Sequence, residues 1–303
     1  MTNLAIAPSP ARTAAASTWR ITPLDAPLGA RVEGLDVRQP LRGEQVFALK
    51  AALREHRILL LPGQWPDDAQ YLRFASHFGT VFAPPPNAPV LGSDAQGIPP
   101  DIVWVSNADE GGVLGHAELS AHADHHWTPQ PSSGSMLHAL EVPSVGGDTT
   151  WIDLVAAYEA LDEATRREID GLQLITYNPF LRRLHPLPGT ARIPRYRTPD
   201  IEPLTPWEAH PLVRTHPDTG RRLIYLGEST EVEVVGWGPI EGQALVERLR
   251  AHILQPRFAY THRWQPGDIV YWDNQATLHS RTGFDAAQRR RLRRISLAGS
   301  RPF

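Results

Sequence analysis

Proline is the residue that most limits the architecture of this chain, because 29 of its 303 residues are proline. Proline lacks a backbone N–H and interrupts the interior of a helix, so this composition argues against a bundle of long helices. Hydrophobic periodicity accordingly predicts helices over four stretches, namely 43–56, 67–78, 153–170 and 239–254.

Short runs typical of strands are more numerous than the predicted helices. They lie at 57–61, 101–106, 135–142, 211–215, 222–226, 257–263, 268–273 and 291–298. Many short strands with Pro/Gly turns and few helices indicate a mainly β fold with flanking helices, either a β-sandwich or a double-stranded β-helix (jelly roll). Two long loops, 82–100 and 177–210, are expected to be lids over a site or disordered.

Charge and composition exclude several classes of protein. Lys and Arg number 30 against 33 Asp and Glu, a net charge of −3 that argues against a nucleic-acid binder relying on a positive field. The absence of cysteine excludes disulfides, Fe–S clusters and Cys-ligated zinc. No apolar stretch is long enough to cross a membrane. We expect a mobile tail over 1–19, one domain over 20–303 and a cytoplasmic enzyme.

A candidate metal site is formed by His122-Ala123-Asp124 together with a distant histidine, His279. Residues i and i+2 of a strand point the same way, so His122 and Asp124 can offer an imidazole and a carboxylate to one ion. Two histidines and one carboxylate on one face of the metal are what a mononuclear non-haem Fe(II) centre requires. The neighbouring His125 and His126 remain open as outer hydrogen-bond donors, substrate contacts or exposed side chains.

An arginine run follows His279 and predicts an anion clamp. If 290–298 is a strand, Arg290 and Arg294 share one face, while Arg289, Arg291 and Arg293 share the other. Burying inward-facing arginines is energetically unfavourable unless anions bind to them, and a guanidinium can bind a carboxylate through two parallel hydrogen bonds. The alternative is a solvated edge, which we expect for residues 289, 291 and 293.

Several motifs together resemble one known family. They are Leu60-Leu61-Pro62-Gly63-Gln64, His122-Ala123-Asp124, Gly146-Gly147-Asp148-Thr149, the stretch from His210 to Pro217, Trp272-Asp273-Asn274 leading to His279, and Arg290 with Arg294. In this order they resemble the Fe(II)/2-oxoglutarate dioxygenases of the taurine dioxygenase family, which includes aryloxyalkanoate dioxygenases. The resemblance runs from about residue 20 to the end of the chain.

This resemblance implies a jelly-roll dioxygenase and a role for each matching residue. His122, Asp124 and His279 would bind Fe(II), while Arg290 and Thr149 would hold the distal carboxylate of 2-oxoglutarate. Arg294 would bind the anionic group of the substrate. With O2 as the second co-substrate, the implied reaction hydroxylates an unactivated C–H and releases succinate and CO2. Relatives often form dimers or tetramers, so a homo-oligomer is expected.

The predicted substrate is a small, partly apolar carboxylate or sulfonate. The first loop reads Phe82-Ala83-Pro84-Pro85-Pro86-Asn87-Ala88-Pro89 and offers few polar donors, which argues against taurine. We expect His126, Trp127 and Phe180 to line the substrate pocket. The alternatives are desaturation, or C–O or C–S cleavage after hydroxylation, by the same chemistry; a hydrolase using His125 and His126; and a non-catalytic jelly-roll binding module.

Overall fold

The computed structural model describes residues 19–85, 90–94, 98–176, 208–227 and 232–303. Residues 1–18 of the predicted tail and almost all of the second predicted loop, with Phe180, lie outside the described residues. None of the described helices is long and apolar enough to cross a membrane.

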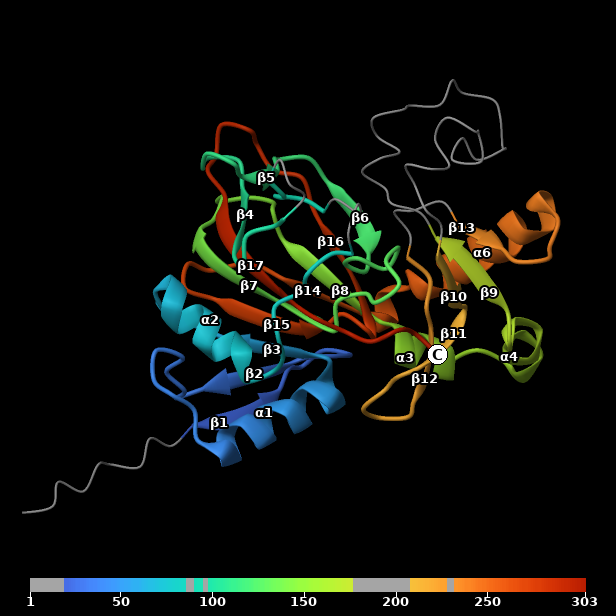
Figure 1. The fold of residues 1–303 in the computed structure, drawn as a ribbon, viewed down its shortest axis with the longest axis horizontal. Coiled ribbons are helices and arrows are strands. Elements are labelled where there is room, and N and C mark those ends of the chain that lie inside the picture. The colour runs from blue at the N-terminus through green and yellow to red at the C-terminus, as the bar shows by residue number, and fades with distance from the viewer. Residues whose placement is uncertain (1–18, 86–89, 95–97, 177–207, 228–231) are drawn as a thin grey trace, which may run out of the picture.

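The larger sheet has the strand order β1-β2-β3-β15-β7-β17-β4-β5 (Figure 1). Its strands are β1 (Arg20–Pro23), β2 (Ala30–Glu33), β3 (Ile58–Leu61), β15 (Ile269–Asp273), β7 (Gly134–Glu141), β17 (Arg291–Leu297), β4 (Val103–Ser106) and β5 (Val113–Leu114). Most neighbours pair antiparallel, whereas β2–β3 and β4–β5 are parallel. The order places segments from both ends of the chain side by side.

The smaller central sheet has the order β14-β8-β16-β6. Its strands are β14 (Ala259–His262), β8 (Thr149–Asp153), β16 (Thr277–Arg281) and β6 (Leu119–His122). In the described part of the chain, one further small sheet contains β10 (Glu208–Pro211), β9 (Gln173–Thr176) and β13 (Val232–Val234), and another pairs β11 (Val213–Thr215) with β12 (Arg222–Ile224).

Side chains of the central strands pack on both faces. In β15, Val270 and Trp272 belong to the same core as Trp151 of the smaller sheet, so this core lies between the two sheets. Ile269 and Tyr271 point the other way, into a core shared with two helices. This alternation follows from the two-residue period of a strand, and burial on both faces explains the continuous apolar sequence of such strands.

The α-helices of the described residues lie outside the central sheets (Figure 1). They are α1 (Gly43–His56), α2 (Asp68–Ser76), α3 (Leu154–Glu159), α4 (Glu163–Ile169) and α6 (Pro239–Ile253). Helices α1 and α2 pack on the larger sheet. Helices α3 and α6 share a core with β8 and β16 of the smaller sheet.

The mainly β fold with flanking helices is confirmed, and three of the four predicted helices match within two residues at either end. The single helix predicted over 153–170 is wrong. Asp153 and Asp162 each accept hydrogen bonds from backbone N–H groups two or three residues ahead. Each therefore caps the start of a separate short helix. Strands β6, β8 and β16 were not predicted, because their His, Ser and Thr residues hide the apolar alternation.

Candidate active site

The two histidines of the candidate metal site are direct partners across a pair of strands. His122 ends β6, and its backbone register partner in β16 is His279. Their ring centroids lie 4.3 Å apart. Directly opposite residues of antiparallel strands place their Cβ atoms close together, so this pairing brings in two imidazoles from positions far apart in the sequence.

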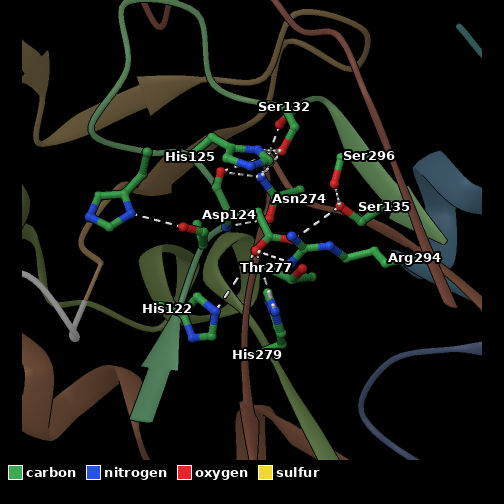
Figure 2. A network of polar contacts seen from close by, with 12 residues as sticks. His122, Asp124, His125, Ser132, Ser135, Asn274, Thr277, His279, Arg294 and Ser296 are labelled. Atoms are coloured by element: carbon green, nitrogen blue, oxygen red, sulfur yellow. Dashed lines mark hydrogen bonds and ion pairs between the residues drawn. The ribbon is translucent and has the colours of Figure 1, made fainter. Parts of the chain in front are cut away.

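Asp124 completes the cluster from a turn rather than from a strand (Figure 2). Its Oδ1 lies 3.8 Å from His122 Nε2 and 3.9 Å from His279 Nε2. One potential ligand atom from each of the three residues lies within 4.8 Å of the others. The expectation that the carboxylate and His122 sit in one strand is wrong, because β6 ends at His122 and the following turn aims the carboxylate.

Both imidazoles present Nε2 to the carboxylate, and a hydrogen bond fixes the ring of His122, whereas His279 Nδ1 is buried with no hydrogen-bond partner among the described residues. His122 Nδ1 lies 2.8 Å from the Ser120 carbonyl oxygen, to which it donates, so the lone pair remains on Nε2. Burial, with help from the nearby His122, lowers the pKa of His279 to about 3, which keeps that ring neutral at neutral pH. Two neutral imidazoles and one carboxylate are a donor set that suits Fe(II).

The Asp124 carboxylate is held ionised by its surroundings. Burial alone would raise its pKa, but the Arg294 guanidinium, followed by His279, opposes this and holds the pKa well below its usual range. Arg294 Nη1 donates to Oδ1 at 3.0 Å, and Ser135 Oγ donates to Oδ2 at 3.1 Å. The carboxylate is therefore ready to bind a cation without first losing a proton.

Asn274 holds the turn that carries Asp124. Its Oδ1 accepts from the Asp124 backbone N–H at 2.8 Å, and its Nδ2 donates to the Asp124 carbonyl at 2.9 Å. Nδ2 also donates to the carbonyl of Ser132 at 2.9 Å. One buried amide thus ties the Asp124 turn to the chain before β7 (Figure 2). The motif Trp272-Asp273-Asn274 contained this residue, but the sequence assigned it no role.

A cavity opens beside the cluster and is lined by side chains from both central sheets. Its walls include His122, His279, Thr149, Arg281, Arg290 and Arg294, with Val105, Leu114, Leu119, Leu137, Trp272 and Ser280. Five of the residues predicted for iron, co-substrate or substrate anion therefore line one space. Arg281, in contrast, was not predicted.

Two predicted co-substrate residues are firmly positioned in this cavity. Thr149 Oγ1 accepts a hydrogen bond from the Trp264 indole at 2.9 Å, which leaves its own proton free to be donated. Arg290 Nε donates to the Gly147 carbonyl at 3.2 Å. Burial, followed by the charge of Arg281, lowers the pKa of Arg290 to about 9. A buried guanidinium in such a position favours an anionic ligand.

The rest of the arginine run only partly follows the predicted faces. Arg289 is exposed beside Glu141, and Arg291 is half-buried in an ion pair with Asp109. The solvated edge expected for Arg293 is wrong, because this residue is only 5% exposed. Helix α2 covers that face of β17, where Arg293 pairs with Asp68 and lies over the Tyr71 ring.

The histidines after Asp124 are buried but do not line the cavity. His125 stacks on Phe82 with ring centroids 3.9 Å apart and has a positive φ of 59°. His126 Nδ1 lies 2.8 Å from the Ala123 carbonyl oxygen and donates to it. Burial lowers the pKa of His125 to about 3 and that of His126 to about 4. The option that these histidines are exposed is therefore wrong.

Trp127 contacts the first predicted loop, in a small apolar cluster with Phe82 and Val90. The predicted pocket residue Phe180 lies outside the described residues. The structure thus brings together the predicted metal and anion residues. It places His126 and Trp127 outside the cavity lining, with Trp127 beside the first predicted loop and His126 against Gly227.

Comparison with known proteins agrees with this geometry. Residues 20–296 match the family described as "Taurine catabolism dioxygenase TauD, TfdA family". Pentalenolactone F synthase of Streptomyces arenae is 31% identical, over 91% of this chain and 94% of that protein. The alpha-ketoglutarate-dependent 2,4-dichlorophenoxyacetate dioxygenase of Cupriavidus pinatubonensis is 32% identical, over 90% and 96%. The alpha-ketoglutarate-dependent sulfate ester dioxygenase of Pseudomonas putida is 30% identical, over 100% and 95%.

Solved structures show the same similarity. AAD-2 in complex with Mn(II) and N-oxalylglycine has a TM-score of 0.77 and 29% identity, covering 94% of this chain and 99% of that one. A putative alpha-ketoglutarate-dependent taurine dioxygenase from Burkholderia xenovorans has a TM-score of 0.75 and 30% identity, covering 94% of each chain. The fold and site define an alpha-ketoglutarate-dependent dioxygenase, and the chain belongs to the TauD/TfdA family.

Proposed function

We propose that the chain binds Fe(II) through His122, Asp124 and His279 and hydroxylates an unactivated C–H of a small anionic, partly apolar substrate. The observation that carries this proposal is the convergence of three ligand atoms beside a cavity that also contains Thr149 and Arg290. The similarity to family structures supports the finer assignment of the two central sheets as a double-stranded β-helix.

Iron, 2-oxoglutarate (alpha-ketoglutarate) and O2 supply the oxidising chemistry when bound, with succinate and CO2 as co-products. The protein's contribution is binding and positioning. Arg290 and Thr149, which line the same cavity as His122 and His279, would hold the distal carboxylate of 2-oxoglutarate. The Leu137 and Val105 side chains form apolar walls of that cavity and limit water in it.

Arg294 would bind the anionic group of the substrate on the metal side. Its guanidinium already lies 3.0 Å from Asp124 Oδ1, so an anion bound by Arg294 would be held close to the metal. An arginine suits a carboxylate, sulfonate or sulfate because its donors match two oxygens at once. Relatives named for 2,4-dichlorophenoxyacetate and for sulfate esters support this class of substrate.

The apolar cluster of Phe82, Val90 and Trp127 lies outside the cavity lining, so it supports an apolar body only for a substrate that extends beyond the cavity towards the first predicted loop. Phe82 and Val90 belong to the first predicted loop and Trp127 to the turn that contains Asp124, and none of the three is charged. Taurine carries an ammonium group that such a surface would not stabilise. We therefore infer an apolar carboxylate, sulfonate or sulfate ester rather than taurine.

The iron and co-substrate assignments are tested by anaerobic spectroscopy. Fe(II) and then 2-oxoglutarate are added to the purified protein, and the visible charge-transfer band of the chelate is recorded. We expect the band in the wild type, none in Asp124→Ala, and at least about tenfold more 2-oxoglutarate needed for Arg290→Met. Arg289→Met, which removes an exposed arginine next to Arg290, is the matched control and should bind normally. No band in folded wild-type protein would refute the proposal.

The substrate class is tested separately by following O2 consumption and succinate formation. The panel consists of aryloxyalkanoates, medium-chain alkyl sulfates, alkyl sulfonates and taurine. We expect the apolar anions to stimulate turnover and Arg294→Met to abolish that stimulation. Taurine as the best substrate would refute the apolar class.

A further inference from the structure

Arg281 is a third arginine of the cavity, and its position follows from strand register. It lies in β16 two residues after His279, so both side chains leave the strand on the same face. Its direct partner in the neighbouring strand β8 is Thr149. Side chains at directly opposite positions have Cβ atoms about 5 Å apart. Arg281 therefore lies next to the hydroxyl proposed to contact 2-oxoglutarate.

The Arg281 side chain is buried and partly held by the backbone. It is 5% exposed, and Nη2 donates to the carbonyl oxygens of Leu114, at 2.8 Å, and Ala117. The guanidinium carbon also lies 5.5 Å from the Phe284 ring centroid. These contacts fix the direction of the guanidinium without neutralising its charge.

The charge of Arg281 has no counter-ion among the residues that the structure describes. Its Nε is buried and has no hydrogen-bond partner there, and neither Arg281 nor Arg290 forms an ion pair with a described carboxylate. The two guanidiniums are close enough for the charge of one to depress the pKa of the other. Asp148 acts on Arg290 through its charge but forms no ion pair with it, so two buried guanidiniums line one cavity with no carboxylate in contact, which is unfavourable until an anion arrives.

A purely structural role explains only part of this arrangement. Tying the backbone at Leu114 and Ala117 requires donors but no positive charge, and it uses only Nη2. It does not account for the unpartnered Nε, for the register with Thr149 or for the placement beside Arg290. An anion bound between the two guanidiniums accounts for all three.

We propose that Arg281 is a second co-substrate-binding arginine, which together with Arg290 and Thr149 makes the cavity selective for a 2-oxo acid with a distal carboxylate. The inference rests on the proposed function, because it assumes that 2-oxoglutarate occupies this cavity. It assigns the distal carboxylate two guanidiniums and one hydroxyl, whereas the sequence motifs pointed to Arg290 and Thr149 alone.

The test compares two co-substrates that chelate iron through the same atoms. 2-Oxoglutarate carries the distal carboxylate, and 2-oxopentanoate has the same five-carbon chain without it. Both are titrated anaerobically into the Fe(II) protein, and the charge-transfer band gives each dissociation constant. The variants are Arg281→Met and, as a matched control, Arg289→Met, which removes the same charge from an exposed position of the chain beside Arg290.

We expect Arg281→Met to weaken 2-oxoglutarate binding roughly 10- to 100-fold and to leave 2-oxopentanoate binding within about twofold of wild type. Binding of Fe(II) alone and the melting temperature should change little, which separates loss of the ligand contact from loss of the fold. Arg289→Met should bind both acids as the wild type does.

Two results would overturn the inference. Unchanged 2-oxoglutarate affinity in Arg281→Met would show that the carboxylate does not use this arginine. An equal loss of affinity for both acids would assign Arg281 a structural role only. A wild-type protein that forms no chelate band with 2-oxoglutarate would instead refute the proposed function itself.

Discussion

Arg294 and Asp124 form a buried ion pair at the centre of the site, with Nη1 of the arginine 3.0 Å from Oδ1 of the carboxylate (Figure 2). The same oxygen faces Nε2 of both His122 and His279. The carboxylate oxygen best placed for a metal is thus already neutralised by a guanidinium. A bound cation and Arg294 would therefore share one negative charge, which couples the metal to the residue proposed to bind substrate.

Replacing Arg294 by methionine should make the protein depend more strongly on metal. Removing one partner of a buried ion pair costs about 3–5 kcal/mol, because the remaining charge is unpaired. A divalent ion would supply the missing positive charge and bind the variant more tightly, and ligand binding raises stability by mass action. We expect Mn(II) to raise the melting temperature of Arg294→Met more than that of the wild type, measured by differential scanning fluorimetry.

Arg293→Met is the control for this prediction. Arg293 is buried in the same strand but pairs with Asp68 on the other face of the sheet. This variant should also be destabilised, with the same Mn(II)-induced shift as the wild type. If Mn(II) raised the melting temperatures of both variants equally, the proposed coupling would be wrong.

Asn274→Ala should weaken metal binding without touching a proposed ligand. The substitution frees the Asp124 turn from its link to Ser132 and leaves buried backbone groups unsatisfied. Loss of groups that orient metal ligands typically lowers metal affinity about 10- to 100-fold. Titration with Fe(II) under anaerobic conditions measures this change. Wild-type affinity in the variant would show that the turn is held in place without the amide.

Gly147→Ala should weaken co-substrate binding through Arg290. Gly147 has a φ of +71°, and an added Cβ would lie 3.0 Å from Arg290 Nε and 3.0 Å from Pro143 Cγ. We expect the guanidinium to be displaced, so that 2-oxoglutarate affinity falls about tenfold while Fe(II) affinity is kept. The chelate band measures the first quantity, and a titration with Fe(II) alone measures the second.

Gly171→Ala provides a matched control for the backbone strain. Gly171 has a similar φ of +74°, but an added Cβ would meet nothing within 4 Å. Both substitutions put alanine in a left-handed conformation, which costs roughly 1–2 kcal/mol. Only Gly147→Ala should change 2-oxoglutarate binding, and equal losses in the two variants would assign the effect to strain.

Acidification should destabilise the protein through buried histidines, and His138 is the clearest example. Arg293 Nε donates to its Nδ1 at 3.0 Å, and its Nε2 donates to the Gln64 carbonyl at 2.9 Å. Burial, reinforced by the charge of Arg293, lowers the pKa of His138 to about 4. The unfolded chain takes up a proton at this residue near pH 6.5, whereas the folded chain does so only near pH 4.

The stabilisation contributed by neutral His138 is therefore complete above about pH 6.5 and is lost as the pH falls from there toward 4. In His138→Asn, the amide oxygen can still accept from Arg293 but no longer titrates. As the pH is lowered from 6.5 toward 4, we expect the free energy of unfolding to fall less steeply in this variant than in the wild type. The two slopes should differ by up to about 1.4 kcal/mol per pH unit. Urea unfolding of the metal-free protein between pH 4.5 and 7.5 measures both slopes, and identical slopes would contradict the assignment.

The sequence predicted the parts of the fold whose patterns are local. Helix α1 coincides with the predicted 43–56, because the helical spacing of its apolar residues can be read within that segment alone. The failure at 153–170 also has a local cause, since the caps at Asp153 and Asp162 were not recognised. Strands β6, β8 and β16 escaped prediction because their inward positions carry His, Thr and Arg, which line a cavity instead of an apolar core.

The sequence by itself determined the family, the mainly β class and the set of His, Asp, Thr and Arg side chains to consider, because motifs keep residue types and spacing. Only the tertiary structure decided which of the other polar residues belong to the site. Strand register placed Arg281 opposite Thr149, and helix α2 buried Arg293 against Asp68. The environment of each strand face, whether a cavity, a helix or water, depends on pairing with distant strands and on the elements that pack over the sheet. The spacing of neighbouring residues in the sequence encodes neither of these.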